Sequence, residues 1–355
     1  MSLLFMNATE FNQPLDSWDV SSVTDPTGMF GVATEFNQDI SMWNTSAFVD
    51  TSNMFRGASS FNQTIGTWDM SSVIRMNSMF KFATGFDQDI TSWDVSSVTS
   101  MNELFSHAVN FNQDLRSWDM SSVQETQFMF RNAKSFNHDI GMWDVSSVTH
   151  MRCMFKNAII FDQPLDLWDV SSVESFYGMF QNATVFNQDI TNWNVSSATH
   201  MGGMFSFATS FNQSIGSWDV SSVLYMWDMF QYAVSFNQDL NSWKFSSDIE
   251  SFVFMFQGAS SFDQTLCWRL DGLSQLVRNG EFNQMLCGSE ANFDPYCFQD
   301  PVVLSPSSPA NCVAPGATFA PAPESAAPFI LRKQLKWHLL TLSTGTLLWL
   351  IEMLS

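Results

Sequence analysis

Carboxylates that recur at a fixed spacing are the side chains of this sequence best suited to chemistry. An Asp follows a Trp in most of a series of 25-residue copies, at Asp19, Asp69, Asp94, Asp119, Asp144, Asp169 and Asp219. If this position lies on a strand, consecutive copies stand about 4.8 Å apart. Ca²⁺ prefers several carboxylate oxygens. The spacing therefore predicts a weak Ca²⁺ strip at Asp69, Asp94, Asp119, Asp144 and Asp169.

Turn chemistry is the competing interpretation of the same row. An Asp side chain can accept a hydrogen bond from backbone N–H groups just after it. Asn44 and Asn194 keep that shape without the charge, and Lys244 and Arg269 end the row with positive charge. These replacements favour turn formation over metal binding, and no cofactor other than Ca²⁺ is predicted.

Signatures of an enzyme are absent from the sequence. It has no Gly-rich phosphate loop, no HExxH and no GxSxG. His150 and His200 occupy equivalent positions two copies apart, which places them roughly 10 Å from each other, too far to share a metal. Cys153 follows Arg152 and is expected to be exposed. We therefore predict that the protein is not an enzyme.

The charge balance limits the kinds of partner. The chain has 35 Asp and Glu against 14 Lys and Arg, a net charge of -21. Binding to nucleic acid needs clustered Lys and Arg that neutralise phosphates, so no nucleic-acid partner is predicted. A protein or a glycan is the expected ligand.

The elements that carry these residues repeat with a strict period. A Phe recurs every 25 residues from Phe5 to Phe230, with Phe256 following after one extra residue, and a Trp comes thirteen positions after most of these Phe residues. Fixed periods of this length are typical of solenoids, in which each unit buries its apolar face against its neighbours.

One copy predicts the local structure. Apolar residues at helical spacing indicate a short helix, namely Val98, Met101, Leu104, Phe105 and Ala108. Ser96 and Ser97 can cap it. Alternation from Trp118 to Met120 indicates a short strand. The predicted fold is an α/β repeat solenoid, a leucine-rich-repeat-like curved stack of about eleven short strand–helix coils. An Asn or Asp ladder, as at Asn37, Asp87 and Asn137, is expected to bind the turn backbones of the next copy.

The copies resemble a known repeat family. Residues 86–105, FDQDITSWDVSSVTSMNELF, and their equivalents are similar to the BspA-like surface-protein repeat, and the resemblance covers residues 1–266. It implies an extracellular, leucine-rich-repeat-like surface protein associated with adhesion, and it brings no catalytic residues. The chain starts inside a repeat without a signal peptide, so we expect a truncated N-terminus and an extracellular or cell-surface location.

The end of the chain differs from the repeats. Four Cys residues lack the paired spacing of a zinc site and favour two disulfides over free thiols, at Cys267, Cys287, Cys297 and Cys312. The predicted organisation is a repeat solenoid, a Cys-containing cap, a Pro/Ser/Ala-rich linker and an apolar tail, at 1–266, 267–300, 301–328 and 329–355. The tail fits a cleaved lipid-anchor signal, a membrane span or an error in the gene boundary.

Glycosylation sequons suit a secreted glycoprotein. The candidates are Asn7, Asn44, Asn182 and Asn194, of which Asn44 and Asn194 are expected to be exposed. Asn62 and Asn212 also form sequons, but they belong to the Asn ladder and are expected to be buried.

The predicted function is that of a non-catalytic recognition or adhesion scaffold that binds on its concave strand face. The alternatives are a structural surface-layer spacer without a ligand, or a cation- or ice-binding solenoid. A binding face should vary between copies, whereas a spacer should not. The residues around the repeated Asp and Trp vary little, but the predicted helix surface varies, at Arg131, Lys156, Gln181 and Ser206.

Overall fold

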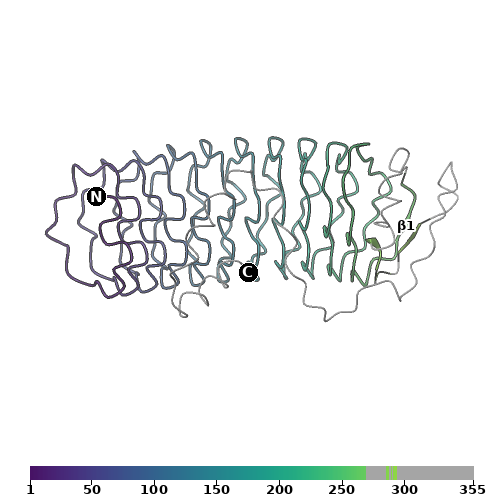
Figure 1. Cartoon of the computed structure of the whole chain (residues 1–355). Coiled ribbons are helices and arrows are strands. Elements are labelled where there is room, and N and C mark those ends of the chain that lie inside the picture. Colours follow the sequence, from purple (N-terminus) through teal and green to yellow (C-terminus); the bar gives the residue numbers. More distant parts are fainter. Residues whose placement is uncertain (269–284, 288, 290, 294–355) are drawn as a thin grey trace, which may run out of the picture. The chain divides into compact units, whose positions relative to one another are not determined.

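The repeats form a stack of 25-residue coils, in which "coil" means one copy of the repeat. The computed structural model describes residues 1–268, 285–287, 289 and 291–293. The chain divides into two compact units, Met1–Cys312 and Val313–Ser355, and the second lies outside the described residues. In the first unit, successive coils lie side by side (Figure 1).

Each coil is built from a run of β-turns. In a representative coil, the N–H groups of Val98, Leu104 and Ala108 donate to the carbonyls three residues earlier, at 2.9, 3.2 and 3.0 Å. The strands that can be described are β1 (Thr265–Leu266) and β2 (Asn292–Phe293), which pair in parallel. None of residues 1–268 lies in a helix.

The predicted α/β solenoid of strand–helix coils is therefore wrong. Glu103 and His107 have φ angles of 59° and 62°, in the left-handed region, which ends any helix. Their N–H groups donate to the next coil, to the carbonyls of Gln127 and Arg131 at 2.8 and 2.7 Å, instead of to the preceding turn. The segment around Trp118 is not a strand either.

Positive φ angles recur at these two positions in every coil from the first to the eleventh. A β-turn of type II requires φ > 0 at its third residue, where Gly is preferred. Here seventeen of the residues with positive φ are not Gly, and they include Val32 and Phe82. Each costs on the order of 1–3 kcal/mol, so the inter-coil hydrogen bonds must offset strain along the whole stack.

The core consists of aligned columns of aromatic rings. Phe105 lies 5.7 Å from Phe80 of the preceding coil, and Trp118 lies 6.4 Å from Trp93. Within a coil, the rings of Phe105 and Phe111 are 3.9 Å apart. The Trp118 indole N–H also donates to a backbone carbonyl of an earlier coil at 3.2 Å. The recurring Phe and Trp residues therefore form stacks along the coils that the structure describes.

A ladder of Asn and Asp side chains joins the turns. The N–H of Asn112 donates to Oδ1 of Asp87 at 2.9 Å, and the N–H of Asn137 donates to Oδ1 of Asn112 at 3.0 Å. The Gln113 amide donates to the same Asp87 oxygen at 2.8 Å. The predicted hydrogen-bonding ladder between coils is confirmed.

The stack continues past the last regular copy. Trp268 lies 6.4 Å from Trp243, and the N–H of Phe256 donates to the carbonyl of Met285 at 2.9 Å, as in a further coil. Cys267 and Cys287 are both disulfide-bonded. Cys297, Cys312, the predicted linker 301–328 and the predicted tail 329–355 lie outside the described residues. In the part of the chain that is described, no helix is long and apolar enough to cross a membrane.

Candidate recognition face

One surface of the stack is formed by the residues where adjacent coils make single parallel bridges. The bridges join Arg75 to Ser100 and Ser100 to Glu125, and the series continues along the stack. We define the ladder face as residues 100, 102, 103, 106 and 107 with their equivalents in the other coils. The residues between them, including Met101, Leu104 and Phe105, are fully buried in the core.

The ladder face differs from copy to copy. At the equivalents of residue 102 the sequence runs through Ser2, Thr27, Ser52, Asn77, Asn102, Gln127, Arg152, Tyr177, Gly202 and Trp227. The core positions, by contrast, keep their Phe and Trp. Arg131, Lys156, Gln181 and Ser206, assigned to a helix surface from the sequence, belong to this turn-built face instead.

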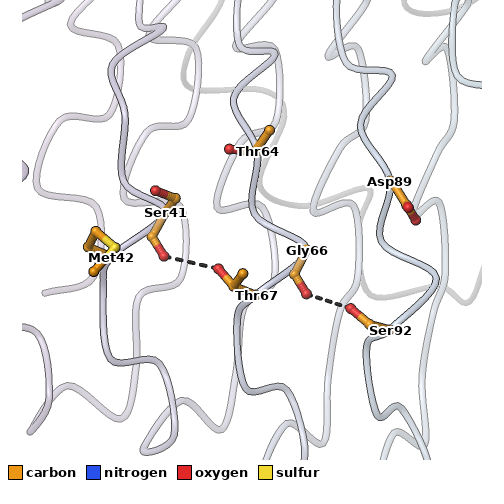
Figure 2. Close-up of a pocket in the computed structure, with 7 residues that line it drawn as sticks. All are labelled: Ser41, Met42, Thr64, Gly66, Thr67, Asp89 and Ser92. Atoms are coloured by element: carbon orange, nitrogen blue, oxygen red, sulfur yellow. Dashed lines mark hydrogen bonds between the residues drawn. The ribbon is translucent and has the colours of Figure 1, made fainter.

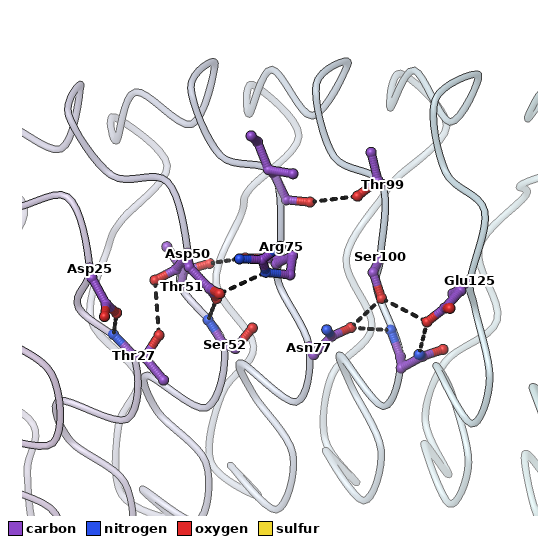
Figure 3. A network of polar contacts seen from close by, with 12 residues as sticks. Asp25, Thr27, Asp50, Thr51, Ser52, Arg75, Asn77, Thr99, Ser100 and Glu125 are labelled. Atoms are coloured by element: carbon purple, nitrogen blue, oxygen red, sulfur yellow. Dashed lines mark hydrogen bonds and ion pairs between the residues drawn. The ribbon is translucent and has the colours of Figure 1, made fainter.

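Two ion pairs join charged side chains on the N-terminal part of the face. Arg75 pairs with Asp50 at 2.8 Å, and Lys81 pairs with Glu103 at 2.6 Å. Ser100 donates to Asn77 at 2.6 Å within the same network (Figure 3). These contacts cross from one coil to the next, so the polar side chains here stabilise the stack.

The middle of the face carries cations without acidic partners. Arg131, Arg152 and Lys156 take part in none of the ion pairs among the described residues, which are Arg75–Asp50, Lys81–Glu103 and Arg116–Asp114. The Nε atom of Arg131 is buried and has no hydrogen-bond partner there. Burial lowers the pKa of Lys156, and the charges of Arg131 and Arg152 lower it further. Arg131 and Lys156 are half-buried, Arg152 is exposed, and the three like charges repel one another.

Aromatic rings alternate with these cations. The Arg131 guanidinium lies 5.8 Å from the Phe128 ring, and the Arg152 guanidinium lies 5.5 Å from the same ring. Arg152 is also 4.7 Å from the Tyr177 ring, which lies 5.2 Å from the Trp227 ring. We define the aromatic–cation row as the cations Arg131, Arg152 and Lys156 together with the rings of Phe128, Tyr177 and Trp227.

Two titratable groups beside the row are held neutral. Burial lowers the pKa of His107 to about 4, with the charge of Arg131 adding to the effect. Cys153 is buried at 3% exposure, so its expected exposure is wrong, and burial raises the pKa of its thiol. Neither group supplies a base or a thiolate at neutral pH.

The repeated Asp residues after Trp serve local turns. Oδ1 of Asp69 accepts the N–H and the O–H of Ser71 at 3.0 and 2.6 Å, and these bonds lower the pKa of Asp69. Asn44 accepts the same two bonds from Ser46. Among the described residues, no group of three or more His, Cys, Asp or Glu could hold a metal. The Ca²⁺ strip stays a prediction, for which turn formation is the alternative.

A small surface pocket lies outside the ladder face (Figure 2). Its hydroxyl groups bond neighbouring coils: Thr67 donates to the Ser41 carbonyl at 3.1 Å and Ser92 donates to the Gly66 carbonyl at 2.6 Å. These two hydroxyl groups are thus engaged within the stack. His150 and His200 lie in the bridge row on either side of Ser175.

Comparison with known proteins places the repeats in a family. Residues 1–87, 62–166 and 159–269 each match the family described as "Mycoplasma protein of unknown function, DUF285". The chain belongs to this family. The three tandem matches mark a repeat protein, although they do not single out the BspA-like proteins. No curated protein and no solved structure matches the DUF285 chain.

The sequons of this DUF285 chain lie in different surroundings. Asn7, Asn44 and Asn194 are exposed. Asn182 is half-buried, and its amide donates to Asn157 at 2.9 Å. The expectation that Asn62 and Asn212 are buried is wrong. Both are exposed, although their side-chain oxygens accept ladder bonds, for example from Asp87 to Asn62 at 2.9 Å.

Proposed function

We propose that this DUF285 repeat protein is a non-catalytic recognition scaffold of the cell surface or extracellular space, which binds its ligand through the ladder face. The observation that carries the proposal is the location of sequence variation. The Phe and Trp rings of the core and the Asn and Asp side chains of the turns repeat from coil to coil. The side chains of the ladder face, by contrast, differ in nearly every copy. A surface-layer spacer without a ligand has no need of such differences.

The composition of the face supports binding. Trp, Tyr and Arg are the residues that most often dominate binding energy at interfaces, and the aromatic–cation row joins all three. The backbone N–H groups at Met101, Glu103, Phe105 and His107 already donate to the next coil. Recognition therefore depends on side chains, and these can differ between coils without breaking the backbone hydrogen bonds that join the coils.

A cell-surface or secreted location is consistent with the disulfides at Cys267 and Cys287, because such bonds persist in oxidising compartments. Adhesion is the form of recognition that suits a long stack with a variable surface. The spacer remains the second candidate, because the Asn and Asp ladder holds the coils together whatever the ladder face carries.

Binding of protein-coated beads to cells and to extracellular matrix tests the proposal. We expect saturable binding that the double variant Arg152→Gln/Tyr177→Ala reduces at least tenfold, the scale of a lost hot spot. The matched control is Lys134→Gln, which removes an exposed cation outside the ladder face. Binding that is absent, or that both variants reduce equally, would support the spacer.

A further inference from the structure

We propose that the aromatic–cation row binds a linear anionic polysaccharide. Carboxylate or sulfate groups would pair with Arg131, Arg152 and Lys156, and sugar rings would pack against Tyr177 and Trp227. This inference rests on the proposed recognition function and names the class of its ligand.

The distribution of charge supports an anionic ligand. The chain is strongly acidic, yet the ladder face holds six of the nine Lys and Arg residues that the structure describes: Arg56, Arg75, Lys81, Arg131, Arg152 and Lys156, with Arg116, Lys134 and Lys244 elsewhere. Arg56 and the last three of the six take part in no ion pair in the described part of the chain. Unpaired charges of one sign, two of them half-buried as Arg131 and Lys156 are, are typical of binding sites.

The guanidinium groups are held ready for a planar anion. The Arg152 guanidinium lies near two rings, Phe128 and Tyr177, at 5.5 and 4.7 Å, and cation–π attraction restricts its position. Arg131 is half-buried, and its Nε–H is buried without an acceptor among the described residues, so a surface anion would meet the rest of this guanidinium and not its Nε–H. A guanidinium fork matches the oxygens of a carboxylate or a sulfate, and its pre-organisation reduces the entropy lost on binding.

The rings supply an apolar surface beside the charges. Tyr177 and Trp227 are half-exposed, and their rings lie 5.2 Å apart, although one complete coil lies between the two coils that contain them. Gly202 belongs to that intervening coil. A Cβ atom on Gly202 would stand 2.9 Å from the Trp227 ring, so the glycine leaves room for the indole. Amphipathic rings of this kind present an apolar face together with a polar edge.

Other polyanions fit the site less well. A nucleic acid carries a charge on every nucleotide and needs clustered Lys and Arg, whereas the row offers three unpaired cations in a chain of net charge -21. An acidic peptide cannot add as a strand here, because the bridge row already uses the inter-coil hydrogen bonds. Sparse charges interleaved with rings match a polysaccharide that alternates sugar faces and anionic groups.

Binding of the full chain to four immobilised polymers tests the inference: heparin, which is sulfated; hyaluronate, which is carboxylated; dextran, which is neutral; and polyglutamate. At about 0.15 M salt, we expect heparin or hyaluronate to bind at least tenfold more tightly than dextran and polyglutamate. The preference between the first two identifies sulfate or carboxylate as the recognised group. Binding should weaken as salt increases.

Variants separate the row from general charge attraction. Arg152→Gln should weaken binding about tenfold, as expected for a lost charge-assisted hydrogen bond. Tyr177→Ala and Gly202→Ala should also weaken it, and Lys134→Gln, which removes the same charge elsewhere, should change it less than twofold. Melting temperatures measured in parallel show whether each variant is folded.

Three results would overturn the inference. Equally tight binding to polyglutamate, or equal losses of binding in Arg152→Gln and Lys134→Gln, would show that the binding is non-specific charge attraction. If neither polysaccharide binds while ladder-face variants still abolish cell or matrix binding, the ligand is of another class and the recognition function stands. If polysaccharide and cell or matrix binding are both absent, both proposals fail.

Discussion

The ring of Tyr177 lies 5.2 Å from the ring of Trp227, although fifty residues separate them in the sequence. The two residues occupy equivalent positions in coils that are not adjacent. The contact spans the coil between them because the equivalent residue there is Gly202, which has no side chain to hold the rings apart. One glycine thus determines whether the two aromatic side chains form a continuous surface.

The substitution Gly202→Ala tests this relationship. We expect the added methyl group to displace the Trp227 indole and to lower the free energy of unfolding by about 1 kcal/mol, at the low end of overpacking costs. Loss of NMR cross-relaxation between the two rings would report the displacement. In a Trp227→Leu background the same substitution should be almost neutral, and an equal cost there would contradict the explanation.

Trp143→Ala tests the aromatic core. Trp143 is 3% exposed, lies 6.4 Å from Trp168 and donates its indole N–H to the Leu115 carbonyl at 2.9 Å. We expect the variant to lose about 3–5 kcal/mol of stability in denaturant unfolding. Trp143→Phe keeps a ring and removes the hydrogen bond, so it should lose less. An unchanged unfolding midpoint in the Ala variant would show that this Trp is not part of the core.

Val32→Gly tests the strain at positive φ. Val32 is β-branched and has a φ of 60°, whereas the next coil places Gly57 at the equivalent position with a φ of 71°. Relief of the strain should outweigh the added flexibility of the unfolded chain and raise stability by about 0.5–1 kcal/mol. Val49→Gly is the control, because Val49 does not have a positive φ, and it should lower the melting temperature. A loss of stability in Val32→Gly would contradict the claim that the backbone of Val32 is strained.

The burial of Asp228 leads us to expect that the free energy of unfolding falls as pH rises. Its Oδ1 is buried without a partner among the described residues, and burial raises the pKa of the carboxyl to about 7. The folded state therefore retains a proton that the unfolded chain releases near pH 4. This contribution is complete below about pH 4 and is lost as pH approaches 7.

Denaturant unfolding at pH 5 and pH 8 measures this effect. From pH 5 to pH 8, the free energy of unfolding of the parent chain should fall by about 2–4 kcal/mol more than that of Asp228→Asn. The paired comparison cancels the titration of other groups. Identical pH profiles for the two proteins would contradict the raised pKa.

Asp119 tests turn formation against metal binding. Its carboxylate accepts the N–H of Ser121 at 3.0 Å, and hydrogen bonds from Ser121 lower its pKa. The stabilisation from these hydrogen bonds is present above about pH 4 and is lost as pH falls through the lowered pKa of Asp119. Asp119→Ala should lose about 0.5–1 kcal/mol, and Asp119→Asn should lose less, because Asn44 and Asn194 accept the same bonds.

Thermal unfolding with Ca²⁺ completes that test. We expect Ca²⁺ to raise the melting temperature no more than NaCl of equal ionic strength does. A larger rise that Asp119→Asn and Asp144→Asn together abolish would instead establish the predicted metal strip.

The sequence predicted which residues are buried better than it predicted the backbone. Val98, Met101, Leu104 and Phe105 are all in the core, as their spacing required. The same spacing suggested a helix because three- and four-residue steps also describe consecutive β-turns. Residues such as Glu103 and His107 carry no sign of a left-handed conformation, which the inter-coil hydrogen bonds impose.

The candidate site could be predicted only in part. Aligning the copies showed that Arg131 and Lys156 vary, but Arg152, Tyr177 and Trp227 were missed. Their contacts join residues 25 or 50 positions apart and depend on the register in which coils stack. The variation of residue 102 and its equivalents was available in the sequence and would have identified this column.

The in-register stack has a consequence at the level of the gene. Almost all stabilising contacts of a coil are with its own residues or with the coils beside it, so an in-frame duplication of 25 codons would add one coil with its core already matched. The extra residue before Phe256 shows that a small change in length is absorbed, because Tyr225 still bridges to Ser251. Recombination between copies could therefore reorder the ladder-face residues without redesigning the interior.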